Sequence, residues 1–224
     1  MGAHLLADLL EDALPQTQCT KCGYPDCRGY AEAMAEAGQK PNRCPPGGIE
    51  GIIRLSKILQ LKTESTTLSI DPECGAERPR PVALIDPKAC IGCTLCIQAC
   101  PVDAIVGASK QMHTVLNDWC TGCDLCVAPC PVDCISMVNV TENHTGWEAW
   151  SSKEAELARK RYHAHSTRLK REERDQILRV ANKARSKLEE LDSDLAQSET
   201  DRAEIERKRQ IIAAALARAK TQTI

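Results

Sequence analysis

Two nearly identical cysteine runs constrain the fold of this chain more than any other feature of its sequence. They read ACIGCTLCIQACPVDAI at residues 89–105 and WCTGCDLCVAPCPVDCI at residues 119–135, each with the spacing C-x2-C-x2-C-x3-C-P. Their aligned cysteines lie 30 residues apart, which indicates an internal duplication. Thiolates two residues apart must curl around one compact centre, and Gly92 and Gly122 provide backbone freedom for that turn. We therefore expect metal–sulfur centres to organise this part, since the chain has no Phe and only three Trp and three Tyr.

The cysteine content, 14 in 224 residues, fits either a secreted disulfide framework or a metal protein of a reducing compartment. The first residues, MGAHLLADLLEDALPQTQ, contain no basic segment and no sustained apolar segment, so they do not form a secretory signal. No stretch approaches the roughly 18 to 20 apolar residues of a membrane span. The sequence thus predicts a cytoplasmic metal protein without a membrane span, with any membrane association peripheral, on the cytoplasmic face of the inner membrane.

The spacing of the two runs is that of two-cluster bacterial ferredoxins, which hold cubane iron–sulfur clusters. Zinc is the alternative metal, but zinc sites usually combine separated C-x2-C pairs and not two four-cysteine runs that end in Cys-Pro. In the ferredoxin arrangement, the fourth cysteine of each run binds the cluster of the other run. This arrangement predicts one [4Fe-4S] cluster on Cys90, Cys93, Cys96 and Cys130, and another on Cys120, Cys123, Cys126 and Cys100.

A further set of four cysteines precedes the duplicated runs: Cys19, Cys22, Cys27 and Cys44. Their spacing is C-x2-C-x4-C-x16-C with no His nearby, and by itself this spacing fits either zinc or a cubane cluster. The two remaining cysteines belong to no set. We expect Cys74 to be a linker thiol and Cys134, which replaces Ala104 of the first repeat, to be a small core residue.

Apolar spacing predicts three helices around the first cysteine set, over residues 5–13, 28–37 and 49–61, with Gly38 as the C-cap of the second. Stretches with β propensity flank the runs: VALID before the first, HTVL before the second and ISMV after it. The predicted fold class is therefore α+β. Its expected parts are a helical four-cysteine iron–sulfur domain (1–62), a linker (63–81), a two-cluster ferredoxin-type domain (82–141) and a charged helical extension (147–224).

The extension differs in charge and composition from the rest of the chain. Residues 151–224 contain 18 Lys and Arg against 13 Asp and Glu, whereas residues 1–150 contain 11 against 18. No Gly or Pro follows Gly146, and apolar residues recur at alternating steps of four and three, which predicts a helical hairpin or a coiled coil with a break at 193–200. The stripe consists of Ile177, Ala181, Ala184, Leu188, Leu191 and Leu195, and continues in Ile205, Ile212 and Leu216.

Two further segments, LEDALPQTQCTKCGYPDCRGYAEAMA and NRCPPGG, accompany the cysteine runs. Together with the C-I-G-C and C-T-G-C-D-L-C blocks, they resemble the RnfB component of the Rnf (also called Rsx) electron-transport complex over about residues 5–140. The resemblance implies a third [4Fe-4S] cluster on Cys19, Cys22, Cys27 and Cys44. Typical members begin with a transmembrane helix, whereas this sequence starts almost directly at the first cluster domain, and the resemblance does not cover residues 147–224.

The leading functional hypothesis is a soluble electron carrier with three [4Fe-4S] clusters, similar to RnfB. Its expected partners are a ferredoxin, a flavoprotein or Rnf/Rsx-type subunits. No GxGxxG turn, Walker loop or nucleophile elbow occurs in the sequence, so we expect no substrate-converting site of its own. The alternative is a regulatory or adaptor iron–sulfur protein whose basic helical tail binds a partner or nucleic acid, although a solvated helix face explains that charge more simply.

Overall fold

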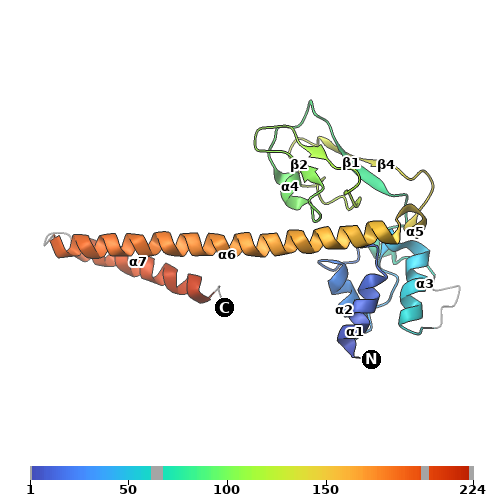
Figure 1. Cartoon of the computed structure of the whole chain (residues 1–224), viewed down its shortest axis with the longest axis horizontal. Helices are drawn as coiled ribbons and strands as arrows, with labels where there is room; N and C mark the ends of the chain where they lie inside the picture. Colours follow the sequence, from blue (N-terminus) through green and yellow to red (C-terminus); the bar gives the residue numbers. More distant parts are fainter. Residues whose placement is uncertain (1, 62–67, 198–201, 222–224) are drawn as a thin grey trace. The chain divides into compact units, whose positions relative to one another are not determined.

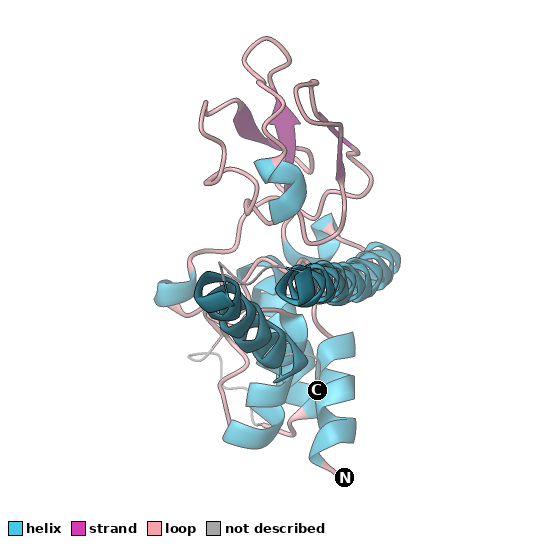
Figure 2. Cartoon of the chain, turned by 90° about the vertical axis from the view of Figure 1, so that its left-hand side faces the viewer, coloured by secondary structure: helices cyan, strands magenta, loops and turns pink. Residues whose placement is uncertain are grey.

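A computed structural model describes residues 2–61, 68–197 and 202–221 of the chain. The chain divides into two compact units, Met1–His165 and Ser166–Ile224. Figure 1 shows the order of the elements, and Figure 2 shows that the strands gather in one part of the first unit while its N-terminal part is helical. Helices together with two small sheets confirm the predicted α+β class.

Three helices form the N-terminal part: α1 (Ala3–Asp12), α2 (Cys27–Ala37) and α3 (Gly48–Ile58), with the 3-10 helix η1 (Pro45–Gly47) before α3. They lie where the apolar periodicity predicts helices. The side chains of Tyr30 and Leu55 are almost completely buried between them. The Asp26 carboxylate accepts the Gly29 N–H at the start of α2, and Gly38 ends the helix in the left-handed conformation, as predicted. These caps fix α2 beside the first cysteine set.

The described part of the predicted linker contacts the N-terminal part. Arg43 pairs with Asp71 at 2.7 Å, next to the short 3-10 helix η3 (Pro72–Cys74). Cys74 is only 5% exposed, so the predicted linker thiol is a buried residue. Residues 63–67 of the predicted linker lie outside the described residues.

Two antiparallel pairs of strands flank the duplicated runs: β1 (Pro81–Ile85) with β4 (Ile135–Asn139), and β2 (Ile105–Val106) with β3 (Thr114–Val115). The duplication relates the two pairs, because Ile85 opposite Ile135 in one becomes Val115 opposite Ile105 in the other. The stretches VALID, HTVL and ISMV form β1, β3 and β4 as predicted, while β2 follows from the duplication and not from local composition. The short helix α4 (Leu95–Ala99) lies within the first run.

After β4 the chain returns to the N-terminal part. Helix α5 (Gly146–Ala149) leads to Trp150, whose Nε1–H donates to the Pro15 carbonyl at 2.8 Å. Trp150 also packs with Ala158 in the first turns of α6 (Ser152–Gln197). The first turns of the charged extension therefore belong to the first unit.

Helix α6 continues into the second unit, and α7 spans Arg202–Thr221. The predicted apolar stripe is the least exposed side of α6: Leu191 is buried and Ile177 is half-buried, whereas Val180 is 55% exposed. Residues 198–201, within the predicted break, lie outside the described residues. Of the helices that the structure describes, none is both long enough and apolar enough to cross a membrane.

Candidate metal centres

One cavity of the ferredoxin-type part is lined by cysteines from both runs. Its empty volume is about 320 Å³, and its cysteines are Cys100 of the first run with Cys120, Cys123 and Cys126 of the second. Most of the remaining wall is apolar, formed by Ala83, Val102, Ala104, Ile105 and Met137. The structure thus brings together the four cysteines that the crossed arrangement predicts for one cluster.

Backbone amides point at two sulfurs of this set. The Ala104 N–H donates to Cys100 Sγ over an N–S distance of 3.2 Å, and the Ala83 N–H donates to Cys120 Sγ at 3.5 Å. Hydrogen bonds of this kind stabilise negative charge on sulfur ligands. The local backbone is therefore suited to thiolates that carry a metal centre.

The other predicted set combines three cysteines of the first run with one of the second: Cys90, Cys93, Cys96 and Cys130. Cys96 interacts electrostatically with Cys93 and Cys90, and Cys130 lies in the same apolar core. Cys134 is their neighbour, because its Sγ lies 3.5 Å from Cys130 Sγ and its thiol also interacts with Cys90. The residue predicted as a small core side chain therefore also contacts predicted ligands.

Cys96 has a histidine neighbour that the sequence analysis does not identify. His113 is 2% exposed, and its Nδ1 lies 3.2 Å from Cys96 Sγ. The signal that would have found it is the duplication itself, because position 113 of one repeat corresponds to Ala83 of the other. A titratable residue at a position where the sister repeat has a methyl group indicates a local difference between the two sites.

The N-terminal cysteines line a cavity of their own. Its empty volume is about 280 Å³, and its wall includes Cys19, Cys22, Cys27 and Cys44. All four thiols are buried. They come from the loop before α2, from the first residue of α2 and from the residue before η1. The structure therefore brings the four predicted residues of this set together.

The loop that carries Cys19 has an unusual backbone. Gln16, Gln18 and Thr20 all have positive φ, at 56°, 54° and 59°. Such conformations cost about 1 to 2 kcal/mol for each residue that is not glycine, and they cluster at functional sites. The side-chain oxygen of Gln18 accepts the Cys27 N–H at 2.9 Å, so this loop is attached to the start of α2. The chain holds a strained loop in the shape that lines the cavity.

Burial opposes ionisation of these thiols. It raises the pKa of Cys27 and of Cys44, and it raises the pKa of Cys123 and Cys126 to about 12. Thiols bind metal as thiolates, so a bound cation must compensate the buried charge. Buried sets of thiols with mostly apolar surroundings and ferredoxin spacing fit an iron–sulfur centre. In the described part of the chain, no three His, Cys, Asp or Glu side chains converge closely enough to hold a single metal ion.

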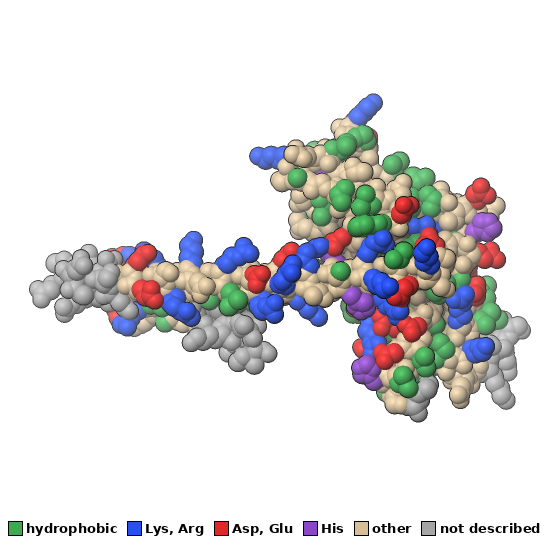
Figure 3. Space-filling model, in the orientation of Figure 1, with side chains coloured by type: hydrophobic (Ala, Val, Ile, Leu, Met, Phe, Trp, Pro, Cys, Tyr) green, Lys and Arg blue, Asp and Glu red, His purple; other side chains and the backbone are tan. Residues whose placement is uncertain are grey.

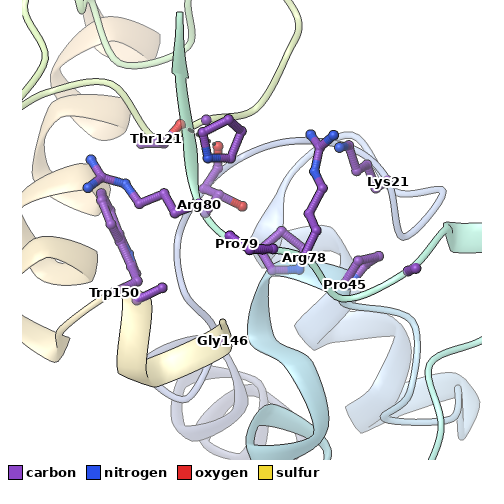
Figure 4. A pocket seen from close by; sticks show the side chains of 14 residues that line it. Lys21, Pro45, Arg78, Pro79, Arg80, Thr121, Gly146 and Trp150 are labelled. Carbon is purple, nitrogen blue, oxygen red and sulfur yellow. Dashed lines mark hydrogen bonds between the residues drawn. The ribbon is translucent and has the colours of Figure 1, made fainter. Parts of the chain in front are cut away.

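A third cavity lies where the two cysteine-bearing parts of the first unit meet (Figure 4), with an empty volume of about 490 Å³. Near it, the Thr121 hydroxyl donates to the Thr17 carbonyl at 3.0 Å, and Lys21 pairs with Asp124 at 2.8 Å. Arg78 also pairs with Asp124, and in Figure 4 its side chain extends toward Lys21. Loops that carry predicted ligands of two different sets are therefore in direct contact.

Comparison with known proteins places the cysteine sets in two described domains. Residues 83–137 match the model of a 4Fe-4S dicluster domain, and residues 14–46 match the model of a putative Fe-S cluster. No solved structure matches the chain.

The chain is also similar to curated proteins that are named as the RnfB-type component of an ion-translocating oxidoreductase complex. It is 54% identical to the one from Thiobacillus denitrificans over 143 residues, which are 64% of this chain and 74% of the relative. It is 56% identical to the one from Azoarcus sp. over 142 residues, 63% of this chain and 75% of the relative. For Stutzerimonas stutzeri the identity is 56% over 143 residues, 64% of this chain and 72% of the relative. Both the sequence resemblance and the iron–sulfur domains are thus confirmed, and the chain belongs to the RnfB family of ion-translocating oxidoreductase complexes.

Proposed function

We propose that this chain transfers single electrons between protein partners by means of three [4Fe-4S] clusters, as a component of an ion-translocating oxidoreductase complex. The observation that supports this most directly is the cavity shared by Cys100 with Cys120, Cys123 and Cys126. Two independent zinc knuckles would take all four ligands from one run each. A ligand contributed by the other run is the arrangement of two-cluster ferredoxins.

Each proposed cluster has its own four ligands. In chain order of their first members, the sets are Cys19, Cys22, Cys27 and Cys44, then Cys90, Cys93, Cys96 and Cys130, then Cys100, Cys120, Cys123 and Cys126. When bound, the clusters supply one-electron transfer without bond making. The protein supplies the thiolates, the backbone N–H groups directed at sulfur, and apolar walls that exclude water, and together these set the potentials.

The proposed partners are redox proteins: a ferredoxin, a flavoprotein or other subunits of such a complex. Nearly all of the twelve proposed ligands are buried, but Cys90, Cys93 and Cys123 are half-buried. Electron transfer between proteins needs close approach of the centres, so we place partner contacts at the surface around these three residues. The structure contains two such regions because the half-buried residues belong to two different sets.

The alternative, an adaptor that binds nucleic acid through the basic tail, has less support. Figure 3 shows basic and acidic side chains side by side along α6. Several of these basic side chains pair with acids three or four residues away, as Lys160 does with Glu156 and Arg168 with Glu172. Such pairing reduces the positive field that nucleic acid would need. We propose that α6 and α7 instead form a helical hairpin or a coiled coil through the apolar stripe.

Iron analysis tests the proposed function. Protein purified without oxygen is expected to contain about twelve iron and twelve sulfide per chain if all three sets bind cubanes. Dithionite should then reduce it to a species with the EPR signals of reduced [4Fe-4S] clusters. About eight iron with one zinc would mean that the N-terminal set is a zinc site, and absence of sulfide would overturn the electron-transfer proposal.

A further inference from the structure

The duplicated halves of the ferredoxin-type part differ at one pair of facing positions. On β1 and β4, Ala83 lies opposite Met137. Moved by 30 residues, these positions correspond to His113 and Gly107. One half therefore combines a small residue with a large one, and the other half has the sizes exchanged, with imidazole in place of methyl.

Gly107 provides the room for this imidazole. A Cβ at residue 107 would lie 3.1 Å from the Cα of His113 and still closer to its ring carbon Cδ2. The Gly107 backbone also has φ +154°, a conformation that side chains disfavour. The strand pair is thus shaped for His113, whose ring is enclosed at 2% exposure.

The ring is oriented toward a predicted ligand. His113 Nδ1 lies 3.2 Å from Cys96 Sγ, within range for a nitrogen–sulfur hydrogen bond, while Nε2 is buried with no hydrogen-bond partner. A thiolate can only accept a hydrogen bond, so Nδ1 must carry the proton. In a neutral imidazole the proton on Nδ1 leaves Nε2 as an unprotonated acceptor, which avoids burying an unpaired N–H.

We propose that His113 tunes one of the two ferredoxin-type clusters by donating its Nδ1–H to the Cys96 thiolate. This inference rests on the proposed function. Reduction adds one electron from an external reductant, with no bond made or broken and no proton transferred, and part of the added negative charge lies on the sulfur ligands. A donor to sulfur therefore stabilises the reduced form more than the oxidised form, which raises the reduction potential.

The consequence is a difference between two sites that the duplication would otherwise make alike. The equivalent residue of the sister repeat, Ala83, has no donor in its side chain. The site of Cys96 is therefore assigned the higher potential contribution from this position. His113 acts through a ligand and is a positioning residue, so potentials and not turnover provide the test.

The experiment is a potentiometric titration of the full-length protein with dithionite, followed by EPR, together with iron analysis of each variant. In His113→Leu, one of the one-electron steps should shift to more negative potential by at least about tenfold in its equilibrium, which is about 59 mV, while the other steps stay in place. His113→Asn places an amide N–H near the position of Nδ1 and should restore most of the shift. His144→Ala removes an exposed histidine that pairs with Glu148 and should change no step.

A reciprocal variant keeps the inference testable if His113→Leu loses iron. Ala83→His combined with Met137→Gly installs the same pair in the sister repeat, and it should raise the potential of the other ferredoxin-type cluster. Unchanged potentials in His113→Leu with full iron, or in the reciprocal variant with full iron, would overturn the inference. Failure of the wild-type protein to bind reducible clusters would instead overturn the proposed function, so the two failures are distinguishable.

Discussion

Cys100→Ser is expected to remove the cluster proposed on Cys120, Cys123 and Cys126, although Cys100 belongs to the other run. The loss should be about four iron and four sulfide per chain. A serine hydroxyl is a much poorer ligand for iron than a thiolate. The cavity that Cys100 shares with these three residues has Ala104, not a thiol, in its wall four residues further on, so no spare sulfur is placed to substitute.

The sister position responds differently because it has a spare thiol. Cys134 Sγ lies 3.5 Å from Cys130 Sγ, and Cys134 corresponds to Ala104 in the duplication. We therefore expect Cys130→Ser to lose less iron than Cys100→Ser, and the double variant Cys130→Ser/Cys134→Ser to lose about four iron per chain. Cys134→Ser alone should retain its full iron.

Iron and sulfide counts with EPR of the four variants decide between crossed and separate ligation. If each run bound its own cluster, Cys100→Ser would spare the site of Cys120, Cys123 and Cys126 and damage that of Cys90, Cys93 and Cys96. Equal iron loss in Cys134→Ser and Cys130→Ser would show that the ligand assignment is wrong at that site.

Gly122→Ala is expected to destabilise the ferredoxin-type part strongly. Gly122 has φ +68°, and an added Cβ would meet the Pro81 carbonyl oxygen, a backbone atom of β1 that cannot turn aside. The left-handed conformation costs about 1 to 2 kcal/mol for a residue with a side chain, and overpacking adds about 1 to 3 kcal/mol. The expected total is about 2 to 5 kcal/mol in the free energy of unfolding.

Gly38→Ala is the matched control. Gly38 has nearly the same φ, +66°, but nothing lies within 4 Å of the added Cβ. Only the conformational cost of about 1 to 2 kcal/mol should remain. The measurement is the urea concentration at which half of the iron–sulfur absorbance is lost, in protein kept without oxygen. Equal decreases in the two variants would show that the contact with Pro81 contributes nothing.

Local features of the chain were predictable from the sequence because they follow from periodic or duplicated patterns. Apolar spacing predicts α1, α2 and α3, and Gly38 predicts the end of α2. The cysteine spacing predicts which thiols share the cavity of Cys100, since a duplication of known spacing fixes partners that lie far apart in sequence.

Features that depend on tertiary contacts were not predictable in the same way. The burial of Cys74 depends on a turn held by Arg43 and Asp71, and linker composition carries no trace of that pairing. The proximity of Cys134 to Cys130 arises from the path of the chain after Pro131. His113 could have been found by comparing the flanks of the two runs position by position, because the repeat extends beyond the cysteines.

The contact between Thr121 and Thr17 joins residues 104 positions apart, and its consequence concerns modularity. The two iron–sulfur parts of the first unit are not interchangeable beads on a string. A chimaera that takes its N-terminal part from another protein would need a carbonyl where Thr17 provides one and a cation where Lys21 meets Asp124. Without them, a buried hydroxyl and a carboxylate would lose partners. Recombination between such proteins should therefore preserve both parts together, as one inherited unit.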